Sequence, residues 1–243
     1  SWVRFFSPMM IGVPVKPIRA QLGNPAIKLA QISVSKRINH FERKGPYVYA
    51  ANDFSIVQLD AAKDEVKETF YPTNSTERIV DLAIYQDSIY ALTPTQLLKG
   101  YLPNPILTDY SQWVRDLRLP FQTAHNYTEM ELFQSRLVVL KKSDAYGSDT
   151  VYRINASDLE IVTNYSFTVE INSINVVDED LSVNIDGVIN LYNDNLHIPK
   201  SYGSGNFVEW FSSARTARTQ AGLWSADMKY GLVMYPTEFV YKA

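Results

Sequence analysis

Residues 47–60 read Tyr-Val-Tyr-Ala-Ala-Asn-Asp-Phe-Ser-Ile-Val-Gln-Leu-Asp. The stretch holds two short apolar runs, separated by the polar residues Asn52 and Asp53. β-Branched and aromatic residues on both sides of an Asn-Asp pair are typical of two antiparallel strands joined by a turn. The stretch therefore predicts a strand, a turn and a second strand, and related stretches recur four more times along the chain.

The recurring unit is a hairpin, and its spacing indicates the architecture. The copies lie at residues 40–51, 82–92, 131–140, 175–185 and 223–235. The anchor residues of their second strands are Val48, Ile89, Leu137, Ser182 and Leu232, which are 41, 48, 45 and 50 residues apart in succession. A period of roughly 40–50 residues is typical of one four-stranded propeller blade.

Further strands are expected after each hairpin. The third strands are predicted at residues 56–59, 96–101, 151–154, 188–192 and 238–241, and outer strands at 66–71, 106–110 and 161–167. A twisted sheet that is apolar on both faces has to be stacked against others, and radial stacking leaves only short edges. The predicted fold is all-β, a propeller-like array of about five antiparallel blades of roughly 40–50 residues.

The first copy carries a likeness to a known family. It ends in Leu59-Asp60-Ala61-Ala62 before Asp64-Glu65-Val66, and in this it resembles blades of the quinoprotein or YncE-like propeller type. The Trp-Asp signature, the paired Gly of kelch repeats and the Asp-box are not found in the sequence. The resemblance therefore implies a generic β-propeller, and no cofactor is carried over from the family.

Two regions are distinguished along the chain. Residues 1–30 form a Pro-rich arm that does not fit the repeat, and residues 31–243 form the β-propeller-like domain. Pro lacks an amide hydrogen and belongs at sheet edges or in extended arms. The arm either supplies the outer strand that the fifth blade lacks or reaches a neighbouring subunit, and the two alternatives do not exclude one another.

Two less regular segments lie between the fourth and fifth hairpins. Residues 201–205 suggest a mobile loop, and residues 212–221 suggest a short exposed helical turn because Ala and Arg are good helix formers. Functional loops of repeat proteins often cluster on one face. These segments are therefore candidates for binding.

Composition excludes several classes of function. The formal net charge is −3 and the isoelectric point about 5.7, without the basic footprint of a nucleic-acid-binding protein. Cysteine is absent, and no run of 18 apolar residues predicts a membrane span. Four Asn-X-Ser/Thr sequons, at Asn74, Asn126, Asn155 and Asn164, give a hint of secretion. A virion or extracellular location is favoured over the cytoplasm.

The residues that could support catalysis or metal binding do not form a known motif. His40, His125 and His197 are widely spaced, and Ser204 lies outside a G-x-S-x-G elbow. Residues 178–180 are acidic, but a solvated turn is favoured there over a calcium site because alternate side chains of the following strand point to opposite faces. No catalytic residue, metal or cofactor is therefore predicted, although a propeller can bring distant residues together around its axis.

Large aromatic and basic side chains near the blade junctions are the candidate binding residues. Tyr and Trp are enriched at interface hot spots and also line sugar-binding clefts, while core packing is the alternative for any aromatic residue of a β-protein. The candidates are Trp113, Tyr202, Trp210, Phe211, Trp224, Arg215 and Arg218.

The sequence favours a non-catalytic scaffold whose loops and rims bind other proteins. The expected partners are other subunits, in a homo-oligomer or a larger assembly such as a virion or phage tail. Two alternatives remain open, namely a secreted or surface carbohydrate-binding module and a hydrolase or lyase with an axial site.

Overall fold

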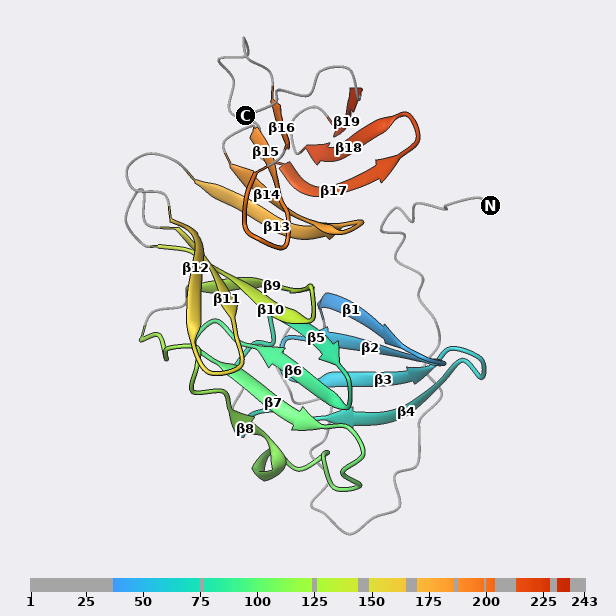
Figure 1. Cartoon of the computed structure of the whole chain (residues 1–243). Coiled ribbons are helices and arrows are strands. Elements are labelled where there is room, and N and C mark those ends of the chain that lie inside the picture. The colour runs from blue at the N-terminus through green and yellow to red at the C-terminus, as the bar shows by residue number, and fades with distance from the viewer. Residues whose placement is uncertain are drawn as a thin grey trace. The chain divides into compact units, whose positions relative to one another are not determined.

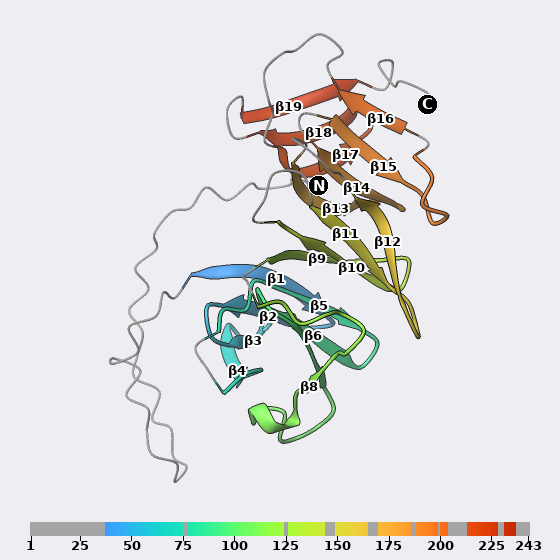
Figure 2. The same cartoon turned by 90° about the vertical axis from the view of Figure 1, so that its left-hand side faces the viewer.

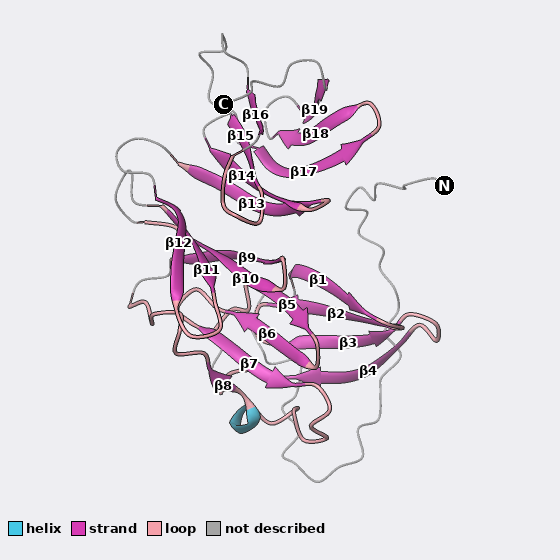
Figure 3. Cartoon of the chain, in the orientation of Figure 1, coloured by secondary structure: helices cyan, strands magenta, loops and turns pink. Residues whose placement is uncertain are grey.

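The computed structural model describes the β-sheets of the chain in detail (Figure 1). The described residues are 37–74, 77–123, 126–143, 149–164, 170–185, 188–198, 200–203, 213–227 and 231–236. Strands dominate them, and the one helical element in these ranges is the three-residue 3-10 turn η2 (Tyr110–Gln112) (Figure 3). The strands form five antiparallel sheets, each called a blade here and numbered in chain order.

Blades one and two each have four strands in simple meander order. Figure 2 shows the strands of blade one lying side by side in that order. Blade one contains β1 (Ile38–Lys44), β2 (Tyr47–Asn52), β3 (Ile56–Asp60) and β4 (Glu65–Phe70). Blade two contains β5 (Asp81–Tyr85), β6 (Ser88–Leu92), β7 (Leu97–Tyr101) and the two-residue β8 (Val114–Arg115).

Blades three to five repeat the same order. Blade three contains β9 (Tyr127–Phe133), β10 (Arg136–Lys141), β11 (Thr150–Ile154) and β12 (Leu159–Asn164). Blade four contains β13 (Ile171–Val177), β14 (Asp180–Ile185), β15 (Val188–Tyr192) and β16 (Lys200–Gly203). Among the described residues, blade five contains β17 (Ser213–Thr219), β18 (Gly222–Asp227) and β19 (Gly231–Pro236).

The tight turn after the first strand of each of blades one to four sets the register of the hairpin. Gln86, Gln134, Ser135 and Asp178 have positive φ values between 48° and 62° in these turns. Two-residue hairpin turns need such left-handed backbone because their twist then matches that of the strands. In blade one the same requirement is met by Gly45 at φ 59°.

The blades pack through their apolar faces, and their innermost strands follow one another. Consecutive innermost strands β1, β5, β9, β13 and β17 are in contact. Each junction holds a buried apolar cluster, with Ile56 and Ile89 between blades one and two and Met130 and Val139 between two and three. Ile174 lies in the cluster between blades three and four, and Leu223 in that between four and five. This arrangement confirms the predicted propeller-like array of antiparallel blades.

The predicted anchor of blade five was wrong. Leu232 lies in β19, the third strand, while the position equivalent to Val48 is Leu223 in β18. Leu223 follows Ser182 by 41 residues, so the period of blade five lies within the range of the other blades. The error followed from treating residues 212–221 as a helical turn, because β17 (Ser213–Thr219) occupies most of that segment and pairs with β18.

Two further local predictions were also wrong. Residues 106–110 form turns rather than an outer strand, which is instead the short β8. Residues 201–203, expected in a mobile loop, belong to β16 and pair with β15. The predicted strand at 238–241 and the arm of residues 1–30 lie outside the described residues.

Gly100 on β7 gives a direct test of the packing in blade two. A Cβ atom at this position would lie 2.8 Å from Leu107 Cδ1 and 3.2 Å from two atoms of the Trp113 ring. We expect Gly100→Val to lower the free energy of unfolding by about 1–3 kcal/mol because the ring has to move. The measurement is urea denaturation, with Lys99→Val as the control at the neighbouring exposed position. Equal stability of the two variants would contradict the packing described here.

Candidate functional site

A cluster of charged side chains lies on the innermost strands. His40 Nδ1 of β1 lies 2.8 Å from Asp81 Oδ1 of β5, and Arg215 Nη1 of β17 lies 2.5 Å from Glu131 Oε1 of β9. The first contact joins neighbouring blades, whereas the second joins blades five and three, which are not consecutive. These four residues are called the axial cluster, and they come from four different blades.

Acceptor side chains beside the axial cluster bind the backbone of the next blade. Asp81 Oδ2 accepts from the N–H of Met130 at 2.8 Å, and Glu129 Oε2 accepts from that of Ile174 at 2.7 Å. The buried Asn175 continues the series, because its Oδ1 accepts from a backbone N–H on β17 at 3.2 Å. One side-chain acceptor on each of β5, β9 and β13 thus satisfies a backbone donor on the following innermost strand. The carboxylates of Asp81 and Glu129 are therefore engaged in holding neighbouring blades together.

The electrostatics of the axial cluster support a structural role. Burial by itself lowers the pKa of His40, but hydrogen bonds to Asp81 and Glu42 outweigh it and raise this pKa to about 9. His40 therefore stays protonated at neutral pH and forms an ion pair with Asp81, whereas a general base has to be free to accept a proton. Burial also raises the pKa of Glu129 to about 7, against the lowering effect of the hydrogen bond from Ile174.

A second feature lies at the outer edge of blade two. Residues 101–121 run from the end of β7 through η2 and β8, and three of their side chains, Leu107, Trp113 and Leu119, are buried in the core. The Trp113 Nε1–H donates to the Leu107 carbonyl at 3.0 Å, which ties the segment to itself. Around these anchors the large exposed apolar side chains are Tyr101, Ile106, Tyr110, Val114, Leu117 and Phe121. We call residues 101–121 the platform.

The platform is nearly without exposed charge. Asp109 is the single charged side chain at an exposed position in this fully described segment, and it caps η2 by accepting from the Ser111 N–H. Leu117 is 78% exposed and Val114 66%. The equivalent outer strand of blade one, β4, instead exposes charged side chains such as Glu65. Apolar and aromatic side chains without charge are typical of the centre of a protein interface.

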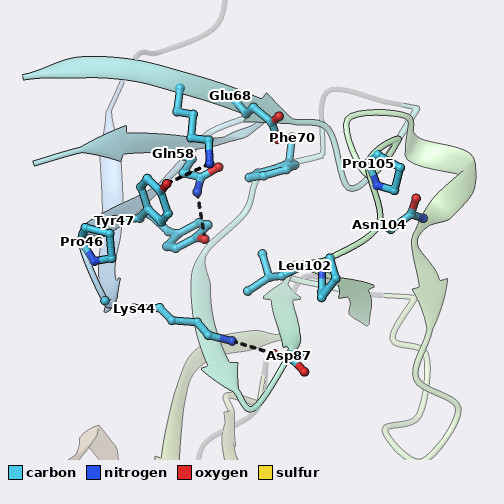
Figure 4. A pocket seen from close by; sticks show the side chains of 14 residues that line it. Lys44, Pro46, Tyr47, Gln58, Glu68, Phe70, Asp87, Leu102, Asn104 and Pro105 are labelled. Atoms are coloured by element: carbon cyan, nitrogen blue, oxygen red, sulfur yellow. Dashed lines mark hydrogen bonds and ion pairs between the residues drawn. The ribbon is translucent and has the colours of Figure 1, made fainter. Parts of the chain in front are cut away.

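A pocket of about 470 Å³ lies between blades one and two (Figure 4). One wall is the face of blade one, with Tyr47, Gln58 and Lys67, and the opposite wall is residues 102–105 at the start of the platform. Lys44 and Asp87 form an ion pair at 3.4 Å across the other end. Pocket and platform therefore share one loop.

The predicted binding residues are found in different settings. Trp113 and Tyr202 are 7% and 3% exposed, so the expectation that their rings are exposed was wrong. Tyr202 packs edge-to-face against Tyr235, at 6.3 Å between ring centroids. Trp224 is partly buried, and its Nε1–H donates to Thr219 Oγ1 at 3.1 Å. Trp210 and Phe211 lie outside the described residues.

The two predicted arginines lie on β17 rather than on a helical turn. Arg215 belongs to the axial cluster, and Arg218 lies 3.3 Å from Asp178 and 3.6 Å from Asp180 of the neighbouring blade. Arg215 therefore faces a largely buried carboxylate and Arg218 faces two carboxylates of a hairpin turn, and the role of both arginines in binding stays a prediction. The acidic residues of the 178–180 turn thus have a guanidinium partner, and no described group of three or more His, Cys, Asp or Glu side chains is arranged to hold a metal ion.

The platform was missed by sequence reasoning. Residues 106–110 were predicted as an outer strand, and none of the exposed side chains of the platform was among the candidate binding residues. The signal that was present is the near absence of charge over residues 101–114, where Asp109 is the only charged residue in a stretch that includes Tyr101, Ile106 and Tyr110.

Comparisons with known proteins agree with the fold. Residues 22–114 match the family described as the N-terminal β-propeller domain of PorZ, TSS9. The matched part covers blade one and almost all of blade two. No curated protein matches the chain. No helix among the described residues has the length and apolar character needed to cross a membrane.

Several solved structures are similar to this chain. PorZ of Porphyromonas gingivalis, described as an essential bacterial surface component of the type-IX secretion system, has 17% identity and a TM-score of 0.63, covering 86% of this chain and 26% of that chain. The extracellular domain of a candidate hybrid two-component system from B. thetaiotaomicron has 14% identity and a TM-score of 0.62, and the match covers 85% of this chain and 30% of that chain. The Cps50 (Swd1) β-propeller domain of Myceliophteria thermophila has 12% identity and a TM-score of 0.55, and the match covers 85% of this chain and 68% of that chain.

These likenesses establish a β-propeller fold. At such identities they do not carry an activity, and the chain spans about a quarter of the length of the PorZ structure. Function therefore has to be argued from the surfaces of this chain.

The axial cluster makes stability depend on pH. The pKa of His40 is raised from 6.5 to about 9, so its contribution is complete below pH 6.5 and is lost as the pH rises through 9. The pKa of Glu129 is raised from 4.5 to about 7, so folding favours its neutral form and stability falls as the pH rises from 4.5 to 7. Together the two groups predict that the free energy of unfolding declines between pH 5 and 9, and His40 accounts for roughly 2–3 kcal/mol of this decline.

The measurement is the melting temperature as a function of pH. His40→Gln should flatten the profile between pH 6.5 and 9, while Glu129→Gln, which keeps an acceptor for the Ile174 N–H, should flatten it between pH 4.5 and 7. Unchanged slopes in both variants would show that these two groups do not control the profile.

Proposed function

We propose that this chain is a non-catalytic β-propeller interaction domain of a bacterial surface assembly, and that the platform of residues 101–121 docks a protein partner. The family match over residues 22–114 and the similarity to PorZ, a bacterial surface component of a secretion system, support the surface location. The similar structures described above include a bacterial surface protein and an extracellular domain, which favours a cell-surface assembly over a virion.

The observation that carries the proposal is the surface chemistry of the platform. Six large side chains of this one segment are apolar or aromatic and exposed, and Asp109 is its single charged side chain at an exposed position. Exposed apolar side chains of soluble monomers are normally scattered singly, and their concentration marks interaction sites. The buried anchors Leu107, Trp113 and Leu119 hold the backbone of the platform in place. A preorganised surface loses little conformational entropy on binding, and this favours a docking role.

The state of the titratable groups argues for a non-catalytic role. Catalysis needs groups whose protonation can change during turnover. In the axial cluster, His40 is held as an imidazolium by Asp81, and Glu131 is paired with Arg215. Burial raises the pKa of Glu129 to about 7, so this group does titrate near neutral pH, but its Oε2 accepts from the Ile174 N–H and is engaged in joining two blades. Asp81 also accepts backbone hydrogen bonds from Leu82 and Met130, so its oxygens are engaged in the fold.

Site-specific photocrosslinking in the native cells tests the proposal. A photoreactive phenylalanine at Leu117 should give a discrete covalent adduct with a partner protein, because this side chain of the platform is 78% exposed. The matched control is the same substitution at Ile161 on β12, which is 55% exposed but lies on another blade.

A second substitution makes the result specific to the platform. Val114→Asp should reduce the Leu117 adduct by about tenfold, since burying an unpaired carboxylate in an apolar interface is costly. The melting temperature of the purified variant should stay unchanged because Val114 is exposed. Equal adducts at Leu117 and Ile161, or an adduct indifferent to Val114→Asp, would overturn the proposal.

A further inference from the structure

We propose that the pocket between blades one and two binds an extended peptide segment of the docked partner. Lys67 binds a backbone carbonyl of the peptide, and Glu68 binds a backbone amide. This inference rests on the proposed function and adds the site and the kind of ligand. The pocket lies beside the platform, and its volume of about 470 Å³ falls within the range of ligand-binding pockets.

The position of Lys67 depends on a β-bulge in the outer strand of blade one. In the pairing of β3 with β4, Gln58 lies opposite Glu68 and Leu59 opposite Val66, so Lys67 has no residue opposite it. Successive side chains of a regular strand point to opposite faces, but a bulge redirects one of them. Lys67 and Glu68, although adjacent in sequence, therefore both line the pocket. Figure 4 labels Glu68 on this wall.

The two side chains offer complementary hydrogen-bonding groups. Lys67 Nζ donates to the Tyr47 hydroxyl at 3.0 Å, which raises the pKa of Lys67 and leaves further ammonium hydrogens for a carbonyl oxygen. The Glu68 carboxylate is exposed and accepts hydrogen bonds only. Among the described residues no ion pair within 4.0 Å engages Glu68, whereas Lys44 and Asp87 are paired with each other. A donor beside an acceptor matches the alternating groups of an extended peptide.

The aromatic residues of the pocket favour a peptide over a sugar. Tyr49 and Phe70 are each 3% exposed and stack on one another, with ring centroids 6.3 Å apart. One face of the Tyr47 ring lies under Lys67 Nζ, 4.2 Å from the ring centroid. Sugar-binding clefts present open ring faces, and these three rings are largely covered. Leu102, Pro103 and Pro105 of the opposite wall supply apolar contacts suited to a peptide side chain.

The pocket is continuous with the platform through its own wall. Residues 102–105 line the pocket, and they are flanked by the exposed platform residues Tyr101 and Ile106. A segment of the partner that leaves the platform therefore reaches the pocket without crossing a charged surface of blade two.

The probe for the test is a phage-displayed library of random 12-residue peptides, selected on the immobilised full chain. Selected peptides are labelled, and their dissociation constants are measured by fluorescence anisotropy. Lys67→Ala and Glu68→Gln should each weaken binding by about tenfold, the loss expected for one charge-assisted hydrogen bond. Glu65→Gln is the matched control, because Glu65 is exposed on the same strand but does not line the pocket. It should leave the affinity unchanged.

The outcomes separate this inference from the proposed function. Peptides that lose affinity in Val114→Asp but not in Lys67→Ala or Glu68→Gln would overturn the pocket assignment and leave the platform as the docking surface. The absence of selected peptides, while the Leu117 adduct is still formed, would do the same. Binding of glycans that is lost in Lys67→Ala would overturn the choice of a peptide in favour of a carbohydrate.

Discussion

The blades depend on one recurring interaction, a side-chain acceptor on one innermost strand that binds a backbone N–H of the next. The ladders within a blade leave the axial edge of each innermost strand without a strand partner, and a buried N–H that lacks a partner costs about 1–3 kcal/mol. Asp81, Glu129 and Asn175 satisfy such donors at three successive junctions. At the first junction the direction is reversed, because Asn39 Nδ2 donates to the Ile79 carbonyl at 2.7 Å.

These hydrogen bonds between innermost strands bear on which parts of the propeller are available for binding. Near the axis, Asp81, Glu129 and Asn175 accept hydrogen bonds from the backbone of the next blade, and the proposed function therefore places binding at the periphery. The outer strands do not have this role in joining consecutive blades, and they differ from blade to blade. β4 is charged and bulged at Lys67, whereas β8 is reduced to two residues. Variation at the periphery on a constant interior is the usual way in which repeat folds acquire binding surfaces.

The sequence predicted the architecture because the hairpin signal is local. Alternation, turn residues and spacing placed the second strands of blades one to four correctly, each within a strand that includes its anchor. Blade five failed at β17, whose residues 213–219 read Ser-Ala-Arg-Thr-Ala-Arg-Thr. Ala and Arg favour helix intrinsically, but pairing with β18 overrides that preference, as tertiary context often does for short segments. The buried Thr216, which contacts Asn175, shows which strand face packs inward.

The candidate site was less predictable, because exposure is a property of the fold. Trp113 looked like a ligand contact, yet it is an anchor whose ring packs against Gly100 and whose burial turns Val114 outward. The bulge at Lys67 likewise follows from a register shift between β3 and β4, and no residue type in these strands predicts that shift. In both places a buried side chain or a backbone irregularity determines which neighbours face solvent. The proposed binding surface of this propeller is therefore set by packing in its periphery, and composition alone points to it only where charge is missing over a long stretch.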